Sequence, residues 1–130
     1  ALHVRANALV ELGAFEALAM VASLEVTGHD DLTLLEGFDR VVTVSGDLRF
    51  SGNEGLETLG GFSSLGVVGG TLEISEHARL SEVTGLTSLT EVGGDLQIVN
   101  NPALPAQNVN DLLERIEQVV GEVEVSGNGD

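Results

Sequence analysis

Histidines and carboxylates are the side chains of this chain that could carry out acid–base or metal chemistry. His29 and His77 occupy equivalent points of two similar segments, two repeats apart. If these segments stack as neighbouring strands do, the two rings lie on the order of 9–10 Å apart. One zinc ion with Zn–N bonds of about 2.0–2.1 Å cannot bridge that gap. We therefore interpret both histidines as hydrogen-bonded turn residues and predict no metal site.

The acidic residues do not fall into a recognised cation-binding or catalytic pattern. Asp30, Asp31 and Asp130 follow neither the EF-hand spacing nor the calcium-binding nonapeptide repeat. Glu25, Arg49 and Glu73 recur at one position of successive segments, where they form a charge ladder on an open face rather than a desolvated acid–base pair. The chain has no cysteine, so thiolate sites are excluded. We expect neither an enzyme nor a cofactor.

The net charge narrows the range of partners. The formal charge is −16, lysine is absent and the five cations are all arginines. Nucleic acid and anionic lipid both require clustered basic residues, so neither is expected as a partner. No run of 18 apolar residues occurs, and membrane insertion is not predicted. Strong acidity suits a cationic partner.

An internal repeat must position these side chains. Lines that begin at Leu24, Leu48 and Leu72 read LEVTGHDDLTLLEGFDRVVTVSGD, LRFSGNEGLETLGGFSSLGVVGGT and LEISEHARLSEVTGLTSLTEVGGD, so the repeat is 24 residues long. Each line opens with alternating apolar residues, which predicts a short strand with one buried face. Further apolar columns follow at steps of three. We predict one domain, residues 1–130, mainly β with one helix, folded as a right-handed β-helix or leucine-rich-repeat-like solenoid of five to six rungs.

Glycine and asparagine columns indicate the corners of the rungs. Gly70 and Gly94 come two residues before a strand, where a corner needs positive φ or a close backbone approach. The segment GGDL at 93–96 lacks the spacing of a phosphate-binding loop. Five residues after each strand start, a polar side chain recurs that we predict to satisfy backbone groups of its own and adjacent rungs. This turn ladder comprises Asn7, His29, Asn53, His77, Asn101 and Asn128.

The repeat resembles a known family. VASLEVTGH and LHVRANAL keep parts of the leucine-rich repeat, and the longer rungs are similar to the receptor L domain found in receptor ectodomains and in bacterial surface proteins. That resemblance implies a ligand-binding solenoid whose broad sheet faces its partner. Receptor ectodomains carry cysteines that this chain lacks, so hormone binding is not implied. Arginine as the only strong cation and a core rich in Ala, Gly and Val indicate a bacterial source.

One helix and two surfaces complete the prediction. NVNDLLERIEQVVG has apolar residues at helical spacing, which predicts a helix over about 109–120 inserted in the fifth rung. The exposed sheet face is predicted to bind a protein or glycan through Arg5, Glu25, Arg49, Glu73 and Gln97. The N-terminal rung leaves apolar residues at an open end, and we predict self-association there through Leu2, Leu9, Leu12 and Phe15.

From these features we predict a non-catalytic recognition or adhesion module of a secreted or cell-surface protein. The alternative is a structural spacer or a self-assembling, homotypic solenoid element of a larger surface protein. Both alternatives place the chain outside the cell or at its surface.

Overall fold

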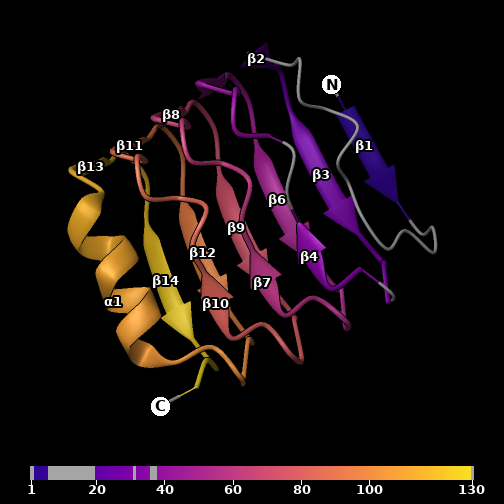
Figure 1. Ribbon diagram of the computed structural model, residues 1–130. Helices are drawn as coiled ribbons and strands as arrows, with labels where there is room; N and C mark the ends of the chain where they lie inside the picture. The colour runs from indigo at the N-terminus through magenta and orange to yellow at the C-terminus, as the bar shows by residue number, and fades with distance from the viewer. Residues whose placement is uncertain (1, 6–19, 31, 36–37, 130) are drawn as a thin grey trace.

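The computed structural model describes residues 2–5, 20–30, 32–35 and 38–129, which form a parallel β-solenoid with one helix (Figure 1). The predicted fold class is confirmed, but the solenoid has about four turns rather than five to six. The difference arises at the ends of the stack. Strand β14 (Val123–Ser126) supplies only the first side of a turn, and residues 6–19, which follow β1 (Leu2–Arg5), lie outside the described residues.

Three parallel sheets form the sides of the solenoid. The largest has the order β1-β3-β6-β9-β12-β14, with β3 (Leu24–Thr27), β6 (Leu48–Ser51), β9 (Leu72–Ser75) and β12 (Leu96–Val99) between its two edges. A five-stranded sheet contains β2 (Met20–Val21), β5 (Thr43–Val44), β8 (Val67–Val68), β11 (Glu91–Val92) and β13 (Gln118–Val119). A three-stranded sheet contains β4 (Leu34–Leu35), β7 (Thr58–Leu59) and β10 (Glu82–Val83).

Equivalent residues of successive rungs lie side by side. Leu48 pairs with Leu24 on one side and with Leu72 on the other, and Phe50 pairs with Val26 and Ile74. Because side chains alternate between the two faces of a strand, this register keeps every apolar column pointing inward.

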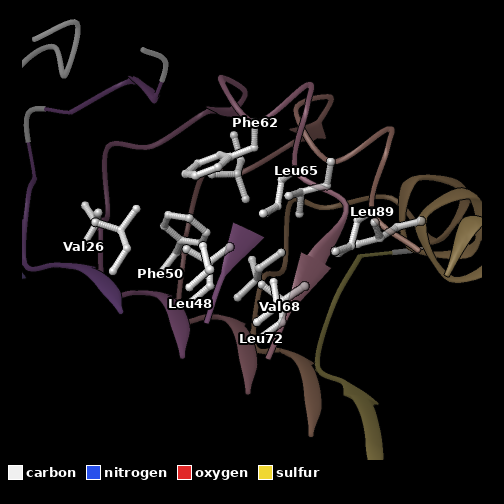
Figure 2. Packing of buried hydrophobic residues seen from close by; sticks show 14 of the residues in the cluster. Val26, Leu48, Phe50, Phe62, Leu65, Val68, Leu72 and Leu89 are labelled. Atoms are coloured by element: carbon white, nitrogen blue, oxygen red, sulfur yellow. The ribbon is translucent and has the colours of Figure 1, made fainter. Parts of the chain in front are cut away.

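The core is therefore a stack of like residues between the sheets (Figure 2). The rings of Phe38 and Phe62 stack with centroids 4.9 Å apart, and Phe50 meets Phe62 edge-on at 5.6 Å. These three rings and the surrounding leucines and valines are buried. Each fully buried aliphatic side chain contributes about 1.5–3 kcal/mol, and neighbouring rungs share that burial, so the rungs stabilise one another.

The corner glycines are required by close stacking. A Cβ atom on Gly94 would lie 2.8 Å from the carbonyl carbon of Gly70, and one on Gly70 would lie 2.8 Å from that of Gly46. Positive φ recurs at the fifth position of the rungs that begin with β3, β6, β9, β12 and β14, and it is also found at Gly61. At the fifth position Gly52 has φ 63°, and the non-glycine residues Glu76 and Asn100 have φ 60° and 57°.

The helix is shifted from its predicted range. α1 spans Ala106–Arg115, so it begins and ends earlier than the predicted 109–120. The residues beyond it return to the solenoid: β13 pairs with β11, and the Gln118 N–H donates to the Thr90 carbonyl at 3.1 Å. Val119 thus lies beside Val92, in the apolar column that also contains Val68. Among the described residues, no helix is both long enough and apolar enough to span a bilayer.

Candidate functional site

The outward face of the six-stranded sheet presents Arg49 among carboxylates. Arg49 on β6 lies 3.3 Å from the Asp47 carboxylate through Nη2 and 3.9 Å from the Glu73 carboxylate through Nε. Glu73 is further held by the Ser75 hydroxyl, which donates to its Oε1 at 2.8 Å. The guanidinium thus pairs with a carboxylate just before its own strand and with one on the next strand, while the Arg49 side chain remains 44% exposed.

Four of the five predicted binding residues follow one line across the sheet, and Arg5 lies in the neighbouring line beside Thr27. The register places Glu25 beside Arg49, Arg49 beside Glu73, and Glu73 beside Gln97. Arg5 lies on β1, which pairs with β3, and its side chain is outside the described part of the structure. Opposite charges in adjacent strands contribute roughly 0.2–1 kcal/mol per pair.

A second line of polar side chains borders this face at the start of the strands. The Ser23 hydroxyl accepts from the Asp47 N–H at 3.3 Å, the Asp47 carboxylate accepts from the Thr71 N–H at 2.9 Å, and the Thr71 hydroxyl accepts from the Asp95 N–H at 3.4 Å. The Asp95 carboxylate accepts in turn from the Glu122 N–H at 2.9 Å. Sequence reasoning missed this line, although Ser, Asp and Thr recur at the residue before each of the four inner strands of this sheet, β3, β6, β9 and β12.

The Asn/His ladder runs inside the turns at the other end of the strands. Asn101 accepts the His77 N–H at 3.2 Å and donates from Nδ2 to the Ile74 carbonyl at 2.9 Å. Asn53 accepts the His29 N–H at 3.0 Å, and Asn128 accepts the Asn101 N–H at 3.2 Å. Each of these side chains thus satisfies a backbone donor of the preceding rung. His29, Asn53, His77 and Asn101 are buried, whereas Asn128 at the end of the ladder is partly exposed, so the ladder stabilises the stack and its inner members are closed to a ligand.

His77 fills the same position as an asparagine. Its Nε2 lies 2.9 Å from the Phe50 carbonyl, and its Nδ1 accepts the Asn53 N–H at 3.4 Å. This pattern fits a neutral ring that carries its proton on Nε2. Burial lowers the pKa of His77 below its usual value, against smaller raising effects from the Phe50 and Asn53 backbone and from Glu76 and Glu73.

The remaining predicted residues differ in how far the structure describes them. His29 is fully buried, in line with its ladder position. Asn7, Leu9, Leu12 and Phe15 lie outside the described residues, and of Leu2 only the backbone in β1 is described.

Two shallow hollows flank the outside of the ladder turns. One is lined by Glu54, Glu76, Ala78, Asn100, Pro102 and Gly127. The other is lined by Asp30, Glu54, Gly55, Ala78 and Arg79. Within the described ranges, no group of three or more His, Asp or Glu side chains is arranged to hold a metal ion. Sequence reasoning did not anticipate these hollows, because each is lined by residues from more than one rung.

Comparison with protein-family models, with curated proteins and with solved structures finds no match to this chain. The geometry shows a parallel β-solenoid with a charged sheet face, and the resemblance to the receptor L domain is one of repeat pattern alone.

Proposed function

We propose that this chain is a non-catalytic recognition or adhesion module of the receptor L type, from a secreted or cell-surface bacterial protein, and that it binds a protein or glycan on the outward face of its six-stranded sheet. The observation that carries the proposal is the fixed arrangement of Arg49 between Asp47 and Glu73. Charged groups already held in position lose little freedom on binding, which favours recognition.

The charge of the face favours a protein with a basic surface. Arg49 is balanced by Asp47 and Glu73, and Glu25 and Glu124 extend the acidic character along the same line. Complementary potentials accelerate encounter and discriminate against like-charged partners. The described phenylalanines are buried, so the face offers charged and polar groups rather than aromatic rings.

A structural role is the second candidate, and the two lines of bonds between rungs, the Asn/His ladder and the Ser23–Asp95 line, favour it. They tie each rung to the next through side chains that satisfy backbone N–H groups, as a rigid spacer or a self-assembling element requires. A spacer depends on those ladders and gives the outward charges no role beyond sheet stability.

Binding of octa-arginine and of a panel of neutral glycans, measured by calorimetry near physiological salt, tests the proposal. Glu73→Lys reverses one charge on the six-stranded sheet, and Glu91→Lys makes the same change on the five-stranded sheet. Both variants alter net charge equally, so a difference between them reports position. We expect Glu73→Lys to weaken octa-arginine binding about tenfold and Glu91→Lys to weaken it about twofold or less.

Thermal melts of both variants establish that the fold is retained. Equal weakening by the two variants would show that octa-arginine responds only to net charge. Saturable glycan binding that Glu73→Lys abolishes would assign the face to a glycan. No saturable binding of either probe would favour the spacer.

A further inference from the structure

The six-stranded sheet ends in an edge whose core columns are uncovered. Val123 and Val125 on β14 pair with Leu96 and Ile98 on β12 and continue their columns. Leu96 and Ile98 are at most 1% exposed, whereas Val123 is 51% and Val125 is 41% exposed. Val120, which precedes the same strand, is 65% exposed. We call Val120, Val123 and Val125, together with the β14 edge, the end face.

The hydrogen-bonding pattern defines what fits this edge. At each preceding step the first strand residue donates its N–H to the next rung, as Leu72 does to the Asp95 carbonyl at 3.0 Å and Leu96 to the Glu122 carbonyl at 2.8 Å. The occupant that continues this pattern is a parallel strand in the same register, with apolar residues beside Val123 and Val125.

The opposite edge strand of the same sheet meets this description. β1 (Leu2–Arg5) pairs in register with β3, Leu2 beside Leu24 and Val4 beside Val26. Leu2 and Val4 therefore belong to the columns that Val123 and Val125 leave uncovered. A second copy that sets β1 along β14 brings Leu2 beside Val123 and Val4 beside Val125.

Charge complementarity supports the same arrangement. The register that aligns Leu2 with Val123 also aligns His3 with Glu124, and it places Arg5 diagonally from Glu124. Inside the sheet, Arg49 and Glu73 are adjacent in the same line. Arg5 thus brings a cationic residue of β1 near Glu124. The sequence spacing agrees with this register, because Asn7 follows Leu2 by the same number of residues as Asn128 follows Val123.

We propose that the end face is a docking surface for the β1 edge of a second copy of this chain, giving head-to-tail association. Such a contact joins two different surfaces and leaves one of each free, so it propagates into short open chains. The net charge of −16 opposes association at low ionic strength, and salt that screens this repulsion promotes it.

Cross-linking tests the geometry, since the chain has no native cysteine. His3→Cys and Glu124→Cys, mixed under mild oxidation, place two thiols on directly opposed residues of strands about 4.8 Å apart, within the Cα separation of about 4.4–6.8 Å that a disulfide spans. We expect mixed disulfide dimers in clear excess over those formed by His3→Cys with Ser64→Cys, an exposed control on another part of the rung. Dominant Glu124→Cys homodimers, or cross-linking no higher than the control, would overturn the proposal.

Solution mass provides an independent test. In about 0.5 M NaCl, where the Debye length is only a few ångströms, light scattering of the parent chain is expected to show mass that rises with concentration. Val125→Lys, and Glu124→Lys as a milder variant, should weaken association about tenfold or more. Val42→Lys is the matched control, because Val42 is 53% exposed away from the end face. A parent chain that is monomeric throughout, or equal association of Val125→Lys and Val42→Lys, would refute the inference.

Discussion

Replacing Asn101 by alanine tests the stabilising role of the turn ladder. The variant removes the acceptor of the His77 N–H and the donor to the Ile74 carbonyl, bonds of 3.2 and 2.9 Å in a buried region. A buried polar group left without a partner costs about 1–3 kcal/mol. Two such groups predict a loss of about 2–6 kcal/mol, a large part of the roughly 5–15 kcal/mol that stabilises a typical domain.

Denaturant unfolding measures this loss as a lower midpoint with an unchanged m-value. Asn110→Ala, on an exposed position of α1, is the control and should change stability by about 0.5 kcal/mol or less. Asn101→His should recover part of the loss, because His77 already occupies the same column. A loss below about 1 kcal/mol in Asn101→Ala would refute the assigned role of the ladder.

Three further predictions follow from single positions. Burial lowers the pKa of His77, so the imidazole binds a proton more readily in the unfolded chain than in the folded one. The free energy of unfolding is therefore full above about pH 6.5 and falls as the pH drops below that value. Thermal melts should show a smaller fall for His77→Asn. Gly94→Ala forces a Cβ atom against the Gly70 backbone and should lower the free energy of unfolding in denaturant by about 1–3 kcal/mol. In the control Gly66→Ala the new Cβ atom meets nothing within 4 Å, so this variant should be neutral or stabilising. Equal effects of the two variants would contradict the close stacking of the corner glycines. Glu76→Gly relieves a positive φ and should raise stability by up to about 1 kcal/mol, and a lower unfolding midpoint would count against that strain.

The solenoid could be predicted because its information is local and repeated. Apolar residues at alternate positions of Leu48–Ser51 and Leu72–Ser75 define strands, and the constant repeat length leaves in-register stacking as the arrangement that buries every column. The two-residue strands of the other sheets are too short for a period to show, so only the apolar columns pointed to them.

The helix limits were misjudged because two patterns overlap. Ile116 and Val119 fit a helical spacing from Leu112, but Val119 also belongs to a strand column that runs through Val92. The tertiary pairing prevails, since β13 completes the five-stranded sheet. The start moved because Pro105, in an extended conformation, immediately precedes the first turn.

The positive-φ column and the end face were missed for different reasons. Gly28, Gly52 and Gly127 mark the left-handed position in three rungs, but Glu76 and Asn100 conceal it in the other two. The exposed valines of β14 look in sequence like those of any inner rung, and only the sheet order reveals that nothing described covers them.

Mapping of octa-arginine on the protein by amide chemical-shift changes tests the proposed function most directly. At 13.5 kDa the chain suits this NMR measurement. We expect the largest saturable shifts to fall on β6, β9 and β12, centred on Arg49 and Glu73, and we expect Glu73→Lys to remove them. Largest shifts at the Glu54–Glu76 hollow or on the five-stranded sheet would contradict recognition by the six-stranded face.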